Sequence, residues 1–497
     1  MKPEPYTSES VPSYSLPEPD VHFLASASEL YDYGNLYRFT RWFRDRYSGS
    51  SGPDKPVVII SHSNDKQVFV IAACWLLGIP FAPLSPAQPE NDLVEQIQRL
   101  NPGLIVAEKK YKKLLPEFEF LSINKKHLHL SGIDHDPSYS EKKPHKLMGY
   151  FLTSGSSGKP KIVPLKRRQM YYGAYASEQN FKPDANRYWL LCLPVNHVGG
   201  ASIIIRSLLY GTAIYRMDKF DRHQVSTFLS ENRLFQAASL VPTMLHRLLL
   251  DPLFQAHREL KAILLGGGPV TPALVKKSIE RGLPVVQSYG MTETCAQIAA
   301  NPLLMPSGTH SPSKSVGKLF APNQIRIRDN QKKPLKINES GMIWLKGPQV
   351  FDGYLNKQDN RQAFDEDGWF NTGDYGHINA HGYIFIETRR SDLIVTGGEN
   401  VNPVDVESAL EGFEEIGQAA VIGIPDEEWG ERVIAYIEPV SVSKYSFTSE
   451  KIRNRLREIL PLYKIPKEIF TLKALPRTES GKIKRQALKE FYKKHSG

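Results

Sequence analysis

Short runs of β-branched and apolar residues alternate with helix-length segments in the N-terminal part of the chain. They include "PVVII" at 56–60 and "GLIVA" at 103–107, with a helix-length segment at 66–77 between them. The later runs "YWLLCLP", "TAIYR", "AASLV", "KAILLG" and "PVVQS" continue the series. This rhythm is typical of βαβ units with parallel strands covered on both faces. We therefore expect an α/β fold, with a large N-terminal domain of parallel-rich sheets and helices.

The pattern changes in the last third of the chain. "QIRIRD", "GMIWLKG" and "GYIFIE" are short strands separated by turns, and they predict a small antiparallel, β-barrel-like subdomain over about residues 315–388. The pattern then returns to α+β on a smaller scale, with helices expected at 403–411, at 450–460 and after Lys484. We expect an N-terminal domain over 1–390 and a small α+β C-terminal domain over 391–497.

Two polar loops that contain glycine follow directly on apolar runs. The first, "TSGSSGKPK" at 153–161, follows "YFL", and the second, "YGMTE" at 289–293, continues "PVVQS". Ligands of parallel sheets bind beyond the carboxyl ends of strands, and the N–H groups, hydroxyls and lysines of the first loop suit phosphates. It is no Walker A loop, because Gly155 and Gly158 are three apart and Lys159 precedes a proline. A flexible Ser/Gly connection is the alternative interpretation.

The charge balance favours small anionic ligands over nucleic acid. The chain has 63 Lys and Arg against 53 Asp and Glu, a net charge of +10. The positive residues are scattered, as on an ordinary solvated surface, and such an excess raises the local concentration of small polyanions. We expect no nucleic-acid partner.

The cysteines and the apolar runs indicate a cytoplasmic protein. Cys74, Cys192 and Cys295 are far apart and form no CxxC pair, so neither a disulfide framework nor a zinc site is supported and a reducing compartment fits. The first residues contain no apolar signal segment, and the longest apolar run, 68–79, is too short to span a bilayer. We expect no membrane span.

Four more motifs follow the two loops along the chain. They are "TGD" (372–374), "RRSD" (389–392), "GGEN" (397–400) and "PRTESGKIKR" (476–485). In this order and spacing, the six motifs resemble those of the adenylate-forming superfamily of acyl-CoA synthetases, luciferases and peptide-synthetase adenylation domains. The resemblance covers roughly residues 30 to 490. It implies that the small C-terminal domain is mobile.

The resemblance assigns the phosphates of ATP to the two loops. In this superfamily a carboxylate attacks the α-phosphate, and the departing pyrophosphate must be held and neutralised. Thr292 would contact the α-phosphate, and Glu293 would bind Mg²⁺, which takes oxygen ligands; an ordinary exposed carboxylate is the alternative for Glu293. The β- and γ-phosphates would be held by the first loop, through Thr153, Ser154, Gly155, Ser156, Ser157, Gly158, Lys159 and Lys161.

The resemblance also assigns the nucleoside. Asp374 would accept hydrogen bonds from both ribose hydroxyls, with Arg389 beside it; a turn-capping aspartate is the alternative. Glycines let the adenine base approach the backbone, although a plain turn explains them nearly as well. The adenine slot would consist of Gly267, Gly268, Ser288, Tyr289 and Gly290.

Lys482 completes the catalytic set that the resemblance implies, together with Thr292 and Glu293. It would bridge the carboxylate and the α-phosphate during adenylation, as a point charge on a flexible stem; a surface lysine in a basic tail is the alternative. The C-terminal domain would then swing and bring a CoA tunnel into place, lined by Gly397, Gly398 and Glu399.

The hinge for this movement would lie in "RRSD", at Ser391 or Asp392. Ser391 stands where the superfamily usually has Asp or Lys, and Thr388 stands where it commonly has Gly. A hinge can be any residue able to absorb the change in backbone dihedrals, so both candidates stay open.

The acid-binding region resembles most closely the o-succinylbenzoate:CoA ligases of menaquinone synthesis, through 193–211, 239–249 and 264–298. The resemblance places His197 where the aromatic acid and pantetheine meet, with Gly266 nearby. It implies that Arg206, on the helix that follows, holds the benzoate carboxylate of the substrate. A structural histidine and a surface or ion-paired arginine are the alternatives. Gly199 stands where serine is common.

We therefore expect an ATP- and Mg²⁺-dependent acid:CoA ligase that forms an acyl-AMP and then a thioester. Its partners would be small molecules, namely an aromatic carboxylic acid, ATP and CoA as co-substrate, and a homo-oligomer is compatible with the sequence. Another aryl-acid CoA ligase, a free-standing adenylation enzyme serving a carrier protein, and a catalytically inactive nucleotide-binding regulator are the alternatives.

Overall fold

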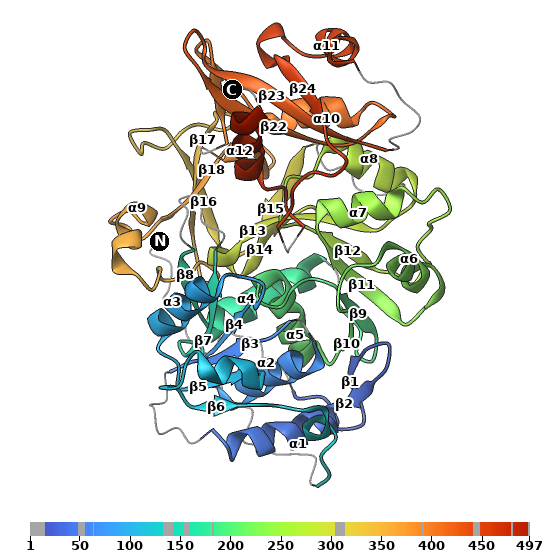
Figure 1. Ribbon diagram of the computed structural model, residues 1–497, viewed down its shortest axis with the longest axis vertical. Coiled ribbons are helices and arrows are strands. Elements are labelled where there is room, and N and C mark those ends of the chain that lie inside the picture. The colour runs from blue at the N-terminus through green and yellow to red at the C-terminus, as the bar shows by residue number, and fades with distance from the viewer. Residues whose placement is uncertain are drawn as a thin grey trace.

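The protein has a large α/β part with a smaller α+β part at one end of its long axis (Figure 1). The computed structural model describes residues 15–47, 55–62, 64–132, 143–153, 160–180, 183–303, 314–389, 392–440, 448–478 and 481–495. Ser154 to Lys159 of the first loop and the hinge candidate Ser391 lie outside these residues. No helix in the described ranges is long and apolar enough to cross a membrane.

A six-stranded sheet forms one layer of the large part, in the order β6-β5-β3-β4-β7-β8. All neighbours are parallel except the hairpin of β7 and β8. The strands are β3 (Val57–Ile60), β4 (Phe81–Leu84), β5 (Leu104–Ala107), β6 (Phe120–Leu121), β7 (Leu147–Leu152) and β8 (Ile162–Lys166). The strands predicted at 56–60 and 103–107 are confirmed as β3 and β5. The first polar loop joins β7 to β8.

A thirteen-stranded sheet forms the second layer, in the order β16-β17-β18-β19-β15-β14-β13-β12-β11-β9-β10-β1-β2. From β13 to β1 its neighbours are parallel, and β2 is antiparallel to β1. This half contains β1 (His22–Ala25), β2 (Leu30–Asp32), β9 (Tyr188–Leu191), β10 (Ala213–Arg216), β11 (Phe235–Leu240), β12 (Ala262–Leu265) and β13 (Val285–Met291). The parallel runs expected from the sequence are thus present.

The other half of this sheet is antiparallel and curls on itself. It contains β14 (Ala296–Ala300), β15 (Ser315–Leu319), β16 (Gln324–Arg328), β17 (Gly341–Lys346), β18 (Phe370–Ile378) and β19 (Tyr383–Arg389). β13 and β18 are four positions apart in the strand order, which is about 19 Å in a flat sheet. Yet Tyr289 Oη of β13 lies 2.6 Å from Asp374 Oδ2 of β18. The expected barrel-like region is therefore continuous with the parallel half, through β13 and β14.

Buried helices fill the space between the two sheets. α2 (Asp65–Leu77) packs on β3 and on α5 (Val198–Tyr210), and α5 packs in turn on β9 and β10. Nearly every residue of α2 is buried, because the helix contacts protein on all sides. It begins at Asn64, whose side chain accepts from Gln67 N, and ends at Gly78 in the left-handed conformation. The helix expected at 66–77 is confirmed.

α4 belongs to the same interior layer as α5, and the other helices of the large part cover its outer faces and ends. α4 contacts α5 and β14, while α6, α7 and α8 pack in series beside the parallel strands (Figure 1). Their bounds are α1 (Tyr33–Arg44), α3 (Glu90–Leu100), α4 (Arg167–Asn180), α6 (Arg222–Glu231), α7 (Pro242–Leu249), α8 (Pro272–Glu280) and α9 (Asn360–Ala363).

The small part contains a five-stranded sheet with cores of its own. Its elements are β20 (Ile394–Thr396), β21 (Glu399–Val401), α10 (Pro403–Glu411), β22 (Ile416–Asp426), β23 (Gly430–Pro439), α11 (Ser449–Arg457), β24 (Glu468–Thr471) and α12 (Arg485–His495). The three helices match those expected from the sequence. α10 contacts α8 and β19 of the large part.

Candidate active site

The first polar loop is closed at its neck by two hydrogen bonds. Thr153 N donates to Lys161 O at 2.9 Å, and Lys161 N donates to Thr153 Oγ1 at 3.3 Å. These bonds continue the antiparallel pairing of β7 and β8 beyond Leu152 and Ile162. Thr153 and Lys161 thus stand together at the carboxyl end of β7, where the sequence predicted a phosphate loop.

Glu293 lies in a short 3-10 turn, η5 (Thr292–Thr294), which directly follows β13. Only 9% of Glu293 is exposed. Its Oε1 accepts a 2.7 Å hydrogen bond from Tyr354 Oη, and its backbone oxygen accepts a 2.8 Å hydrogen bond from Phe351 N. The carboxylate is therefore buried and oriented, which makes an ordinary exposed carboxylate the wrong description of Glu293.

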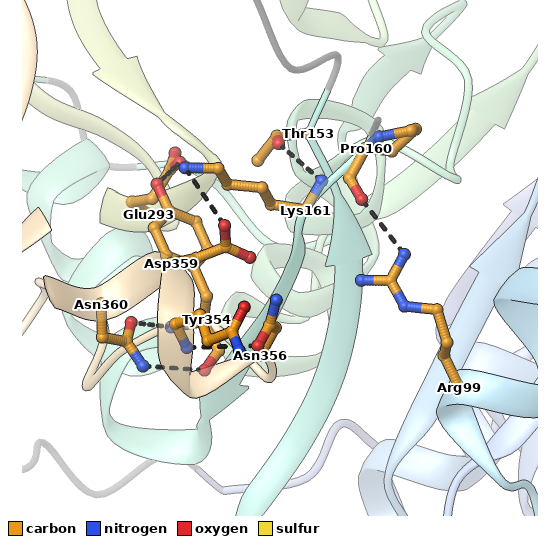
Figure 2. A network of polar contacts seen from close by, with 10 residues as sticks. Arg99, Thr153, Pro160, Lys161, Glu293, Tyr354, Asn356, Asp359 and Asn360 are labelled. Carbon is orange, nitrogen blue, oxygen red and sulfur yellow. Dashed lines mark hydrogen bonds and ion pairs between the residues drawn. The ribbon is translucent and has the colours of Figure 1, made fainter. Parts of the chain in front are cut away.

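Lys161 and Glu293 face the same corner from opposite sheets (Figure 2). Lys161 Nζ lies 4.7 Å from the centre of the Tyr354 ring and 3.8 Å from Asp359 Oδ1. The ring of Tyr354 is therefore shared by the cation and the carboxylate. Sequence reasoning missed both Tyr354 and Asp359. The available signal in the sequence was the glycine before an aromatic residue in "DGYL", because glycine is common where the backbone turns. In the structure Gly353 indeed has a φ of +132°.

The second carboxylate of the site, Asp374, is held by Tyr289. Asp374 is 4% exposed and accepts a 2.6 Å hydrogen bond from Tyr289 Oη, while its own N–H donates to Thr372 Oγ1 at 3.0 Å. Gly373 before it has a φ of +75°. Arg389 stands opposite Asp374 in the register of β18 and β19; its side chain lies outside what the structure describes.

The glycine-rich turn after β12 lies against the end of β13. Ser288 Oγ donates to Leu265 O at 3.1 Å, and a Cβ on Gly266 would lie only 2.7 Å from that hydroxyl. A Cβ on Gly290 would lie 1.8 Å from Ala296 O, because β13 and β14 approach closely there. Gly267 has a φ of +77°, and Gly268 follows it in the turn. Glycine is thus required at Gly290 by packing, independently of any ligand.

Lys482 reaches this turn from the small part of the molecule. Its Cε would lie 3.7 Å from a Cβ on Gly267, and the preceding Gly481 accepts a 3.1 Å hydrogen bond from Thr243 Oγ1. Thr478 shapes the lysine's own turn, since its N–H donates to Lys482 O at 2.7 Å. The structure therefore brings Lys482 to the strand ends where the adenine slot was predicted.

Arg206 is buried beside a small, partly open cavity. It is 3% exposed, its Nη1 donates to Ser202 Oγ at 3.1 Å, and its guanidinium lies 5.3 Å from the centre of the Trp189 ring. Ser202 lines the cavity together with Gly173, Val198 and Cys295. Burial lowers the pKa of Arg206 to about 10.

The charge of Arg206 has no carboxylate to balance it in the described part of the chain. No ion pair is formed there by Arg206, and its buried Nε has no hydrogen-bond partner among the described residues. An uncompensated buried cation is costly, so an anion fits beside it. His197 is the N-cap residue of the same helix and is half-buried.

The predicted CoA residues lie in the hairpin of β20 and β21. Gly397 and Gly398 have φ of +58° and +82°, and Gly397 N donates to Trp429 O at 2.8 Å within the small part. Glu399 is exposed. This hairpin and the Lys482 turn are separate parts of one small domain, and both the Lys482 turn and α10 make described contacts with the large part.

Asp392, the described hinge candidate, belongs to a charged cluster. Arg485 donates to Glu407 Oε1 at 2.5 Å and to Val421 O at 3.3 Å. Burial opposes the charged form of Arg485, but the carboxylates of Glu407 and Asp392 outweigh it and raise the arginine's pKa. The cluster ties the segment after Lys482 to the segment that joins the two parts.

Polar loops at the strand ends of the large part, with a lysine brought to them by the small part, are the arrangement of an adenylate-forming enzyme. The chain belongs to the AMP-binding enzyme family: residues 38–355 match the AMP-binding enzyme domain and residues 405–482 match the AMP-binding enzyme C-terminal domain. It is 34% identical to the 2-succinylbenzoate–CoA ligase of Enterococcus faecalis over 431 residues. These residues are 86% of this chain and 87% of the Enterococcus faecalis protein.

Solved structures of o-succinylbenzoate coenzyme A synthetase from Bacillus subtilis are also similar. The complex with the acyl-adenylate intermediate has a TM-score of 0.80 at 28% identity and covers 95% of this chain and 96% of that one. The complex with ATP and magnesium also has a TM-score of 0.80 at 28% identity, and the match covers 95% of this chain and 97% of that one. A double mutant bound to a product analogue scores only 0.67, at the same identity and the same coverage as the acyl-adenylate complex. The structure thus matches the ATP and acyl-adenylate complexes better than the product-analogue complex.

Proposed function

We propose that this protein is an ATP- and Mg²⁺-dependent 2-succinylbenzoate–CoA ligase. The succinyl carboxylate attacks the α-phosphate of ATP, giving acyl-AMP and pyrophosphate. The CoA thiolate then attacks the acyl carbon, giving the thioester and AMP. The observation that carries the proposal is Arg206, a buried cation without a carboxylate partner in the described chain, beside a cavity in a chain related to 2-succinylbenzoate–CoA ligases.

Lys161, Glu293 and Tyr354 form what we call the ATP corner, and we propose that it acts mainly through fixed charges. Lys161, with Thr153 and the loop residues after it, holds the β- and γ-phosphates, and Thr292 contacts the α-phosphate. The oxygen-only side chain of Glu293 fits Mg²⁺, because it is buried and one oxygen is already oriented by Tyr354. Bound Mg²⁺ would neutralise charge on the phosphates. Groups held in position before the reaction stabilise the charge that develops on pyrophosphate.

The nucleoside and the acid are proposed to occupy the neighbouring strand ends. Asp374, with Arg389 opposite it, accepts the ribose hydroxyls, and Ser288, Tyr289 and Gly290 with Gly267 and Gly268 form the adenine slot. Arg206 pairs with the benzoate carboxylate, and His197 and Gly266 lie where the succinyl arm meets the α-phosphate. A second carboxylate on the substrate would thus balance the buried guanidinium.

Domain alternation is proposed to separate the two half-reactions. Lys482 is positioned for adenylation, which is supported by its contact with the Gly267 turn and by the closer similarity to the acyl-adenylate complex. Rotation about Ser391 or Asp392 would bring Gly397, Gly398 and Glu399 to the acyl-AMP as the CoA tunnel. We also propose a cytoplasmic location, which is supported by the three buried, unpaired cysteines.

The test is AMP release with ATP, Mg²⁺ and CoA over a panel of acids. The panel contains 2-succinylbenzoate, benzoate, 4-hydroxybenzoate, a medium-chain fatty acid and no acid. Turnover confined to 2-succinylbenzoate is expected, since benzoate alone lacks the succinyl arm. Turnover with another acid would overturn the substrate but keep the enzyme class. Acyl-AMP formation without thioester would favour the adenylation enzyme that serves a carrier protein.

A further inference from the structure

The segment 347–360 is fastened to the strand that follows the phosphate loop. Gln169 Nε2 donates to Val350 O at 3.2 Å, and Leu355 N donates to Ile162 O at 3.0 Å. Arg168 Nη1 donates to Pro348 O at 3.0 Å, and its other Nη pairs with Asp352. The segment is thus joined at several points to β8 and to the start of α4.

Tyr354 is oriented within this segment by its own neighbours. Its N–H donates to Asn360 Oδ1 at 2.7 Å, and Asn360 Nδ2 donates back to Tyr354 O at 3.1 Å (Figure 2). Its ring packs edge-on against Phe351, with centroids 4.8 Å apart. Backbone and ring are therefore held before any ligand arrives.

The side chain of Tyr354 touches both charged groups of the ATP corner. Its hydroxyl donates to Glu293 Oε1 at 2.7 Å, and its ring lies under Lys161 Nζ at 4.7 Å (Figure 2). A neutral phenol can orient a carboxylate without neutralising it, and it uses only one of the carboxylate's lone pairs. A ring face likewise attracts a cation without removing its charge. The contacts with Tyr354 thus leave a second oxygen of Glu293 and the N–H groups of Lys161 for a ligand.

Asp359 supplies a weak counter-ion to Lys161. The two side chains are 3.8 Å apart, and their exposed fractions are 31% for Lys161 and 27% for Asp359. An ion pair of this length in contact with solvent contributes little stability. It can therefore give way to a phosphate oxygen.

We propose that Tyr354 is a positioning residue that sets the metal affinity of Glu293 and, through its ring, the placement of Lys161. This inference rests on the proposed ATP-dependent adenylation. The hydroxyl orients Glu293 Oε1 and leaves Oε2 for Mg²⁺, while the ring keeps Lys161 directed at the pyrophosphate end. Asp359 holds Lys161 in the absence of ATP and does not affect the binding of Mg²⁺ by Glu293.

The test is Tyr354→Phe, which removes the hydroxyl and keeps the ring. In ATP–pyrophosphate exchange, the half-saturating free Mg²⁺ concentration is expected to rise about tenfold, the effect of losing one charge-assisted hydrogen bond. Thioester formation from preformed acyl-AMP and CoA should change less than about twofold. Tyr37→Phe is the matched control, since that hydroxyl donates to Pro17 O at 2.6 Å far from the corner; its Mg²⁺ dependence should stay at the wild-type value.

Two further variants separate the effect of the Tyr354 hydroxyl on Glu293 from the effect of its ring on Lys161. Tyr354→Leu should raise both the half-saturating Mg²⁺ concentration and the KM for ATP, because it also removes the ring from Lys161. Asp359→Asn should leave the Mg²⁺ dependence unchanged and should not raise the KM for ATP. If Tyr354→Phe folds with wild-type thermal stability and shows unchanged Mg²⁺ dependence, or if both half-reactions fall equally, the inference is overturned. A wild-type protein with no exchange for any acid would instead overturn the proposed function.

Discussion

The hydroxyl of Tyr289 donates a 2.6 Å hydrogen bond to Oδ2 of Asp374, joining two strands that are not neighbours in the sheet. Both residues are buried. The bond exists because the antiparallel half of the large sheet curls and brings β18 back to the end of β13. It fixes the orientation of the carboxylate proposed to bind ribose.

Tyr289→Phe should therefore weaken ATP binding. Asp374 would lose one hydrogen bond and rotate more freely, so the KM for ATP is expected to rise about five- to tenfold in ATP–pyrophosphate exchange. The KM for the acid should change much less. Tyr375→Phe is the control, because that hydroxyl donates to Ser340 O at 2.9 Å from the other side of β18. Equal effects of the two variants would contradict the positioning role of Tyr289.

Lys482→Ala should separate the two half-reactions. The lysine is proposed to bridge the carboxylate and the α-phosphate only during adenylation, so exchange should fall by a factor of about 10² to 10³. Conversion of preformed acyl-AMP and CoA to thioester should continue. Lys484→Ala, in the same exposed segment, should leave both steps near wild type. A similar loss in both half-reactions would speak against domain alternation.

Arg206→Met should stabilise the folded protein and weaken the binding of the acid substrate. The buried guanidinium has no carboxylate partner among the described residues, so an apolar side chain of similar length should raise the free energy of unfolding by about 1 to 3 kcal/mol in the absence of substrate. The KM for 2-succinylbenzoate should rise strongly and the KM for ATP little. Thermal unfolding and steady-state kinetics measure the two effects. A destabilised variant with unchanged KM would place Arg206 in a purely structural role.

Glu411 should make the stability of the folded protein pH-dependent. Burial raises the pKa of Glu411 from 4.5 to about 7; a hydrogen bond with Thr271 of the large part opposes this, and Glu407 adds to it. The pKa of Glu411 is higher in the folded state than in the unfolded state, so the protonated carboxyl favours folding. This contribution to the free energy of unfolding is fully present below pH 4.5 and is lost as the pH rises through 7.

Glu411→Gln keeps the shape and removes the charge. It should raise the free energy of unfolding by about 1 to 2 kcal/mol at pH 8 and by less than about 0.5 kcal/mol at pH 5. Thermal unfolding at the two pH values measures this difference. The comparison with wild type cancels His246, whose pKa is lowered to about 4, chiefly by burial and then by Lys277. An equal effect at both pH values would contradict the assignment.

Local elements could be predicted from the sequence because their signals are local. The helix expected at 403–411 is α10, with Asn402 as its N-cap and Pro403 at its first position. The strand at 56–60 and the helix at 66–77 follow from the same short-range patterning. The antiparallel character of the region after β14 was equally visible, since short strands and turns alternate there.

The order of the candidate site residues along the chain was also determined by the sequence, through motifs whose members lie close together. Thr292 and Glu293 are adjacent, and Thr153 and Lys161 close one loop. The roles of these residues stay predictions. What each side chain contacts could not be predicted, because the partners come from elsewhere in the chain.

Only the tertiary structure decided which partners hold the charged groups. Tyr354 is 61 residues from Glu293, and Asp374 is 85 residues from Tyr289. No periodic pattern encodes such pairs, since they depend on how the sheet curls and on where a loop is fastened to another sheet. The sequence by itself determined the elements and the chemical groups of this protein. The curvature of the sheet and the docking of the small domain determined where those groups meet, because packing, not chain proximity, sets distances between segments far apart in sequence.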